Sequence, residues 1–163
     1  MFYNFLFRLI ITVSVFIALK INNVTSLPLL VIILFLFDVL DCGLSPIPID
    51  SKTYQYQKKD KVMDILMYAF FVTLFHDLFD AMTLKLLVGF IVIRAIGVFK
   101  FYSTGNTKYL KYFPDFINST MIAYTIYVQF SLSRSTYYIM IIIGMIIKIF
   151  FEFKFHDRVY IRS

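Results

Sequence analysis

Residues 27–43 read "LPLLVIILFLFDVLDCG", an uncharged apolar run that ends in two aspartates, Asp38 and Asp41. Runs of this kind are typical of helices that lie in a membrane, where an α-helix needs roughly 20 mostly apolar residues to cross the hydrocarbon core. Apolar segments recur along the chain at about 4–20, 26–41, 61–79, 83–102, 114–132 and 135–153. The sequence therefore predicts an all-α integral membrane protein with six transmembrane helices, built as a single transmembrane domain over residues 1–163.

The composition excludes several other classes of protein. Of the 163 residues, 60% are hydrophobic and 16% charged, which is too apolar for a water-soluble domain. The single cysteine, Cys42, cannot form an intramolecular disulfide, and His76 and His156 lack zinc-ligand spacing. The net charge of +6 is scattered between apolar segments, which favours an anionic membrane surface or a phosphorylated substrate over nucleic acid.

The distribution of basic residues predicts the orientation in the membrane. Six spans place both termini and the second and fourth loops on one side. That side carries ten Lys and Arg residues, and the opposite side carries three, namely Lys20, Lys85 and Arg134. Because cytoplasmic loops are enriched in basic residues, we expect both termini to be cytoplasmic. The helix ends that carry the aspartates would face the same compartment, so the expected protein is multi-pass with a cytoplasmic active site.

Four aspartates form two pairs with helical spacing. Asp38 and Asp41 lie three residues apart at the end of the second apolar segment, and Asp60 and Asp64 lie four apart at the start of the third. Each pair projects from one face of its helix. Because one loop joins these two helix ends, we expect the four carboxylates to converge on a pocket just below the membrane surface.

Such a pocket requires neutralisation of the carboxylates. Four ionised carboxylates repel one another and are costly to bury, so they must be protonated or bound to cations. Ligand sets made only of oxygen suit hard divalent ions, and the sequence predicts Mg²⁺ or Mn²⁺. A simpler interpretation is that the acids are solvated at the interface and that Asp60 caps the third helix.

This arrangement resembles the signature of the CDP-alcohol phosphatidyltransferase family. That signature runs Asp, two residues, Asp-Gly, two residues, Ala-Arg, a spacer, Gly, three residues, Asp, three residues, Asp. The matching residues, with Cys42 as a single insertion, are Asp38, Asp41, Gly43, Asp60 and Asp64. The resemblance extends over nearly the whole chain, as six helices with Arg8 in the first and Arg94 in the fourth.

The resemblance implies an enzyme of phospholipid biosynthesis. It would transfer a phosphatidyl or related phospho-alcohol group from a CDP-linked donor to an alcohol and release CMP. Asp38, Asp41 and Asp60 would ligate metal, and Asp64 would ligate a second ion or take the proton of the attacking alcohol. A homodimer and lateral entry of the membrane lipid are also implied.

The chain departs from the signature in its loop. Pro46 and Ile47 occupy the Ala-Arg positions and Tyr56 stands at the spacer glycine, positions that in the family help to approach the CDP group. Lys58 or Lys59 would then serve as a phosphate partner, with ordinary surface lysines as the alternative. The departures leave open a non-catalytic relative that acts as a scaffold. Intramembrane acids also leave open a small ion or proton transporter.

Other charged residues have two interpretations each. Arg94, inside an apolar segment, would bind an anionic acceptor or would make a structural ion pair or snorkel to the membrane edge. Asp115 would border the pocket or cap a helix, and Lys148 is expected to snorkel. The stretch "HDLFDA", with its acids Asp77 and Asp80, starts about 12 residues after Asp64 or roughly 20 Å along a helix, so it is predicted to be a solvated outer end.

Overall fold

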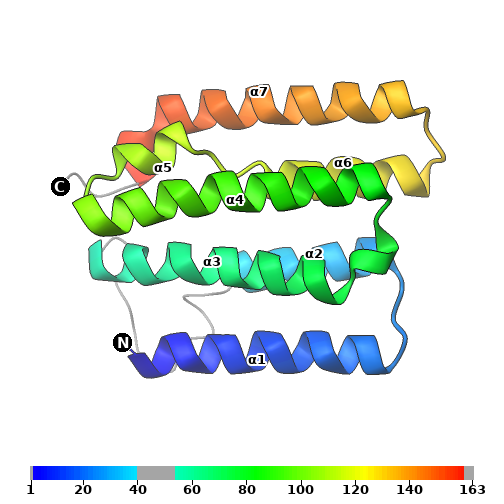
Figure 1. The fold of residues 1–163 in the computed structure, drawn as a ribbon, viewed down its shortest axis with the longest axis horizontal. Helices are drawn as coiled ribbons and strands as arrows, with labels where there is room; N and C mark the ends of the chain where they lie inside the picture. Colours follow the sequence, from blue (N-terminus) through cyan, green and yellow to red (C-terminus); the bar gives the residue numbers. More distant parts are fainter. Residues whose placement is uncertain (1, 40–53, 160–163) are drawn as a thin grey trace. The chain divides into compact units, whose positions relative to one another are not determined.

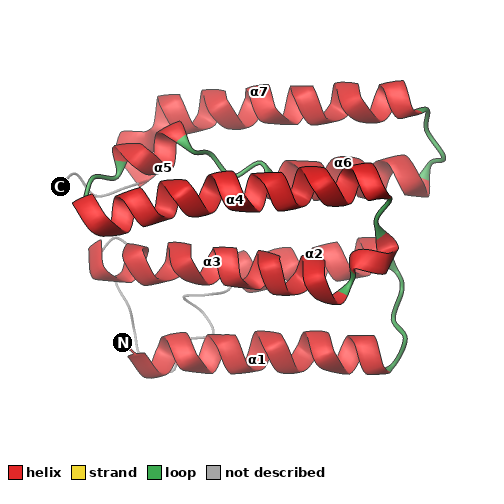
Figure 2. Ribbon diagram, viewed as in Figure 1, coloured by secondary structure: helices red, strands yellow, loops and turns green. Residues whose placement is uncertain are grey.

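Helices make up all the regular secondary structure in the described part of the chain, residues 2–39 and 54–159 of a computed structural model (Figure 2). The predicted all-α fold is confirmed. Each of the six apolar segments overlaps one long helix. These helices are α1 (Phe2–Ile21), α2 (Leu27–Val39), α3 (Tyr54–Leu74), α4 (Ala81–Thr104), α6 (Ile117–Gln129) and α7 (Arg134–Val159). A short 3₁₀ turn, η1 (His76–Leu78), and a five-residue helix, α5 (Lys108–Tyr112), lie between them.

Two of the described helices are long and apolar enough to cross a membrane. They are α4 over its whole length and α7 from Arg134 to Lys154, judged by length and composition. Shorter apolar stretches lie in α1, at Leu9–Ile21, and in α2, at Leu27–Phe37. The two long helices are the membrane feature that the fold supports, while the six-span arrangement and the side of the termini stay predictions.

The chain divides into two compact units, residues 1–80 and residues 81–163. In the first unit α1 packs along α3 (Figure 1). Phe16 of α1 is fully buried, and its ring centroid lies 5.4 Å from that of Phe71 on α3 and 6.2 Å from that of Phe75, the residue between α3 and η1. It also lies 6.1 Å from the ring of Phe37 on α2. Edge-to-face contacts of this kind stabilise a core beyond the area that they bury, so Phe16 joins all three helices.

In the second unit α6 and α7 form an antiparallel hairpin, and α4 packs against α6 (Figure 1). A Cβ atom added at Gly144 of α7 would lie 2.9 Å from the Cβ of Ser119 on α6. Small residues therefore let these two backbones approach closely, as in helix pairs within membranes. A buried hydrogen bond of 2.9 Å between the hydroxyls of Thr83 and Tyr137 joins the first turn of α4 to α7.

Three helix ends are closed by residues with positive φ. Asn23 (φ 53°), Gly105 (φ 76°) and Ser131 (φ 48°) follow α1, α4 and α6. After α1, the amide of Val24 donates to the carbonyl of Leu19, and the amide of Asn23 donates to that of Lys20. This pair of bonds is a Schellman motif, which satisfies carbonyls that the helix leaves unpaired. These three helices therefore end near a residue in the left-handed region.

The start of α3 differs from the prediction. The third helix was expected to begin near residue 61, after a long loop, whereas α3 begins at Tyr54. The segment from 54 to 61 is polar, and hydropathy detects only the apolar part of a helix. Because Gln and Lys are good helix formers, this polar segment is helical without being apolar. Lys58, Lys59 and Asp60 are therefore helical residues and not loop residues.

The far end of the first unit is joined by an ion pair. The ammonium of Lys20, in the last turn of α1, donates to both carboxylate oxygens of Asp77 in η1, at 2.9 and 3.0 Å. This hydrogen bond holds the pKa of Asp77 below its ordinary value of 3.8. The contact stabilises the fold above pH 3.8, where Asp77 is charged in both states, and is lost as the pH falls through the lower pKa of the folded state.

We expect Asp77→Asn to lower the melting temperature slightly, because the pair is exposed and such pairs contribute little. The difference from wild type should be constant above pH 3.8 and should vanish in stronger acid. Thermal unfolding in detergent, followed by circular dichroism across this range, measures it. A difference that grows on acidification would contradict the assignment.

Gly97 of α4 is required by the close approach of Phe113. A Cβ atom at Gly97 would lie 2.9 Å from Cγ of Phe113 and closer still to its Cβ, whereas one at Gly89 of the same helix would meet nothing within 4 Å. Gly97→Ala should therefore destabilise the protein by about 1–3 kcal/mol. The matched Gly89→Ala should be neutral or stabilising by up to about 1 kcal/mol. Equal effects of the two substitutions on the free energy of unfolding would contradict the requirement for glycine beside Phe113.

Candidate functional site

Two of the four predicted acids, Asp60 and Asp64, share one cation in the first unit. The ammonium nitrogen of Lys61 lies 2.8 Å from Oδ2 of Asp60 and 2.9 Å from Oδ2 of Asp64. The three side chains are largely buried, with exposed fractions of 20% for Lys61, 12% for Asp60 and 11% for Asp64. The two carboxylates of this acid pair thus aim one oxygen each at the same point.

Their place on α3 follows from the spacing of the residues. Asp60 and Asp64 are four apart and therefore lie on the same face of α3, one turn from each other. Asp60 is the seventh residue of this helix, so its side chain cannot cap the first turn. The capping interpretation of Asp60 is wrong, because the polar segment before it is already helical.

The other half of the predicted metal site lies largely outside the described residues. Asp38 belongs to the last turn of α2, but its side chain is not described. Asp41 and Gly43 lie outside the described residues, as do Pro46 and Ile47. Among the described side chains, no group of three or more His, Cys, Asp or Glu residues comes together. The convergence of all four acids stays a prediction.

The donor atoms of the acid pair fit a hard divalent cation. Carboxylate oxygens are the ligands that Mg²⁺ and Mn²⁺ prefer, and one oxygen from each acid already meets a common positive charge. The Lys61 ammonium marks the point at which such a charge is held. Two carboxylates are only part of a coordination shell, so a metal would also need Asp38, Asp41, water or substrate oxygens.

Lys58 and Lys59, the predicted phosphate partners, lie in the second turn of α3 and not in a loop. Both are partly exposed. Lys58 already interacts with another part of the protein. Their binding of a phosphate group stays a prediction, but the helix gives each a fixed direction that a loop would not.

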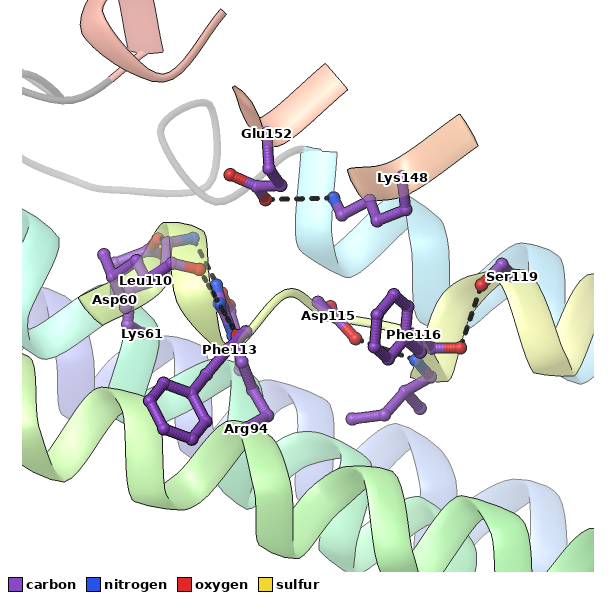
Figure 3. A network of polar contacts seen from close by, with 12 residues as sticks. Asp60, Lys61, Arg94, Leu110, Phe113, Asp115, Phe116, Ser119, Lys148 and Glu152 are labelled. Atoms are coloured by element: carbon purple, nitrogen blue, oxygen red, sulfur yellow. Dashed lines mark hydrogen bonds and ion pairs between the residues drawn. The ribbon is translucent and has the colours of Figure 1, made fainter. Parts of the chain in front are cut away.

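Arg94 makes two hydrogen bonds to the main chain of the second unit. It is buried on α4, and its Nη1 donates to the carbonyl of Leu110 at 3.0 Å and to that of Phe113 at 2.6 Å (Figure 3). These carbonyls lie at the end of α5, where helix carbonyls lack partners within the helix. The guanidinium therefore holds α5 against α4. This contact supports the structural interpretation, and binding of an anionic acceptor stays a prediction.

Two ionic groups, Lys61 and Glu152, are not among the site residues that the sequence predicts. Lys61 lies three residues before Asp64, a spacing that brings side chains together on a helix. Glu152 lies on α7. It is buried, and its carboxylate lies 3.5 Å from the ammonium of Lys148, four residues before it (Figure 3). Lys148 thus reaches along α7 toward the end that carries Glu152.

Two further sequence interpretations find support. In "HDLFDA", His76 and Asp77 are exposed, as a solvated helix end should be. Asp115 accepts a hydrogen bond of 2.9 Å from the amide of Ile117, the first residue of α6, and so satisfies one of the amides that the start of the helix leaves unpaired, while Phe116 is the N-cap residue (Figure 3). Both features belong to helix ends and require no ligand.

Comparison with known proteins adds no relative. No protein-family model, curated protein or solved structure matches the chain. The resemblance to the CDP-alcohol phosphatidyltransferases therefore rests on the four aspartates, Gly43 and their spacing.

Arg94→Met should destabilise the second unit by about 2–4 kcal/mol, because two buried carbonyls lose a charged donor. Limited proteolysis should then cut faster near α5. Arg94→Lys restores one donor and should recover part of the loss, since lysine lacks the planar fork of arginine. An Arg94→Met protein as stable as wild type in equilibrium unfolding, with unchanged cleavage, would contradict the structural role.

Proposed function

We propose that the chain is a six-span membrane enzyme of the CDP-alcohol phosphatidyltransferase type. It transfers a phosphatidyl or phospho-alcohol group from a CDP-linked donor to an alcohol acceptor. The observation that carries the proposal is the acid pair, in which Asp60 and Asp64 direct one oxygen each at a shared cation position. The acids at positions 38 and 41 supply the matching first half of the pattern.

Asp38, Asp41, Asp60 and Asp64 would hold Mg²⁺ or Mn²⁺. When bound there, the ions supply positive charge that offsets the charge of the donor diphosphate and of the departing CMP. Gly43 leaves room for the donor to approach the loop, and Lys58 or Lys59 contacts its phosphates. Arg94, where it is not engaged by the α5 carbonyls, would meet an anionic acceptor.

Asp64 takes the proton of the acceptor hydroxyl. As the acceptor oxygen forms its bond to the β-phosphorus, the bond from that phosphorus to the bridging oxygen breaks. CMP leaves with the electron pair, and the hydroxyl proton passes to Asp64. A carboxylate held on a helix beside the reacting group is suited to this role, and no covalent protein intermediate is required.

In the proposed membrane arrangement, this chemistry takes place at the cytoplasmic surface. The polar first turns of α3 carry Lys58, Lys59, Asp60 and Lys61, and the apolar remainder of the helix follows. Such a helix fits a span whose polar end reaches the head-group region. Together with α4 and α7, it supports a multi-pass protein whose site opens to the cytoplasm and to the lipid.

A specific observation also favours a second candidate, a non-catalytic relative that acts as a scaffold. Lys61 offsets one of the two negative charges of the acid pair. Acids paired with a lysine can have a purely structural role, without binding a metal. The altered loop, with Pro46 and Ile47 in place of Ala-Arg, points the same way.

CMP release by the purified protein tests the choice. In detergent, with CDP-diacylglycerol, Mn²⁺ or Mg²⁺ and a panel of alcohols, we expect release that requires the metal and one acceptor. Asp60→Asn and Asp64→Asn should each lower the rate at least about 100-fold, because each removes a ligand or the base.

Asp77→Asn is the matched control, since it makes the same chemical change in an exposed acid at η1. It should keep the wild-type rate. Release that persists in both site variants would exclude the proposed chemistry. Absence of release with every acceptor would favour the scaffold.

A further inference from the structure

Lys61 contacts one carboxylate oxygen of each of two acids, Asp60 and Asp64, that the proposed function assigns to a metal. Its ammonium lies 2.8 Å from Oδ2 of Asp60 and 2.9 Å from Oδ2 of Asp64. A metal ligated by the same oxygens could not be bound while the ammonium stays there, because both cations need the same lone pairs and repel each other. Metal and lysine therefore compete for one place.

The contacts of Lys61 are of a kind that a divalent ion can displace. Lysine is a single point charge on a flexible four-carbon stem, and immobilising that stem costs conformational entropy. Adjacent residues do not face each other on a helix, so the stem of Lys61 must bend to reach Asp60. A divalent ion carries twice the charge of the ammonium, and its binding does not require a flexible lysine stem to be ordered.

The Lys61 side chain is also partly exposed to solvent. It is 20% exposed, against 12% for Asp60 and 11% for Asp64, so it is the most solvent-exposed of the three side chains. An ammonium that leaves the acid pair can move toward water by a change of rotamer, with no movement of α3.

We propose that Lys61 is an exchangeable internal cation, which offsets one of the two negative charges of Asp60 and Asp64 in the metal-free protein and is displaced when a divalent ion binds. The inference rests on the proposed metal site and adds a residue that sets its affinity. Lys61 stabilises the metal-free fold, and by the same contacts it weakens metal binding. It is a positioning residue for the acids, not a catalytic one.

Mn²⁺ binding to the full-length protein in detergent tests this, with the unbound ion measured by electron paramagnetic resonance. Lys61→Met should bind Mn²⁺ about 3- to 10-fold more tightly than wild type, because a competing pair of this strength is removed. Lys85→Met removes the same charge from an exposed position on α4 and should change the affinity less than about twofold. Arginine binds carboxylates more strongly than lysine because its planar guanidinium can donate two parallel hydrogen bonds. The Lys61→Arg variant should therefore bind Mn²⁺ more weakly than wild type.

A second readout is thermal stability without metal. Lys61→Met should melt below wild type when Mn²⁺ is absent, and saturating Mn²⁺ should remove most of the difference. If Lys61→Met does not fold, the weakened Mn²⁺ binding of Lys61→Arg still decides the matter. Equal affinities for wild type, Lys61→Met and Lys61→Arg would overturn the inference.

The outcomes separate this inference from the proposed function. Wild-type Mn²⁺ binding that is lost in Asp60→Asn, yet unchanged in both Lys61 variants, would overturn the role of Lys61 and leave the metal site standing. No Mn²⁺ binding by any variant would overturn both. Tighter binding by Lys61→Met supports the inference even if no CMP is released, in which case only the transferase proposal fails.

Discussion

An ionic group that leaves water must meet an opposite charge or a dipole, and this constraint shapes the polar contacts of an otherwise apolar chain. Lys61 meets Asp60 and Asp64, and Glu152 meets Lys148. Arg94 meets main-chain carbonyls at the end of α5. Each contact joins residues close in sequence or orders a neighbouring element, so the charged residues of the protein organise its helices.

The apolar part of the chain follows a different constraint, namely how closely helices can approach. Because Gly97 has no side chain, Phe113 can approach α4 closely. Because Gly144 has none, Ser119 of α6 can approach α7 closely. In the first unit, large aromatic rings around Phe16 fill the space between helices. Aromatic rings also pack in the second unit, where the ring centroids of Tyr124, Tyr127 and Tyr137 lie 5.0 to 5.9 Å apart, so that unit combines small residues at close helix contacts with large rings.

The acid pair connects this packing to function. Two carboxylates that share a cation are a metal site when the cation is a divalent ion and a structural ion pair when it is lysine. Under the proposed function, the free energy difference between these two states would decide whether the protein acts as a metal-dependent transferase or as a scaffold. Because Lys61 lies in the same helix as both acids, one element of the fold holds the acids and their competitor.

By itself, the sequence determined the helical class, the approximate position of the six long helices and the pairing of Asp60 with Asp64, because apolar runs and helical spacing are local properties. Only the tertiary structure decided that Arg94 holds α5 and that Gly97 must be small. It also decided that Lys61 faces both acids. These outcomes depend on which rotamer a side chain adopts and on which neighbour fills the space beside it, and neither is encoded in a periodic pattern.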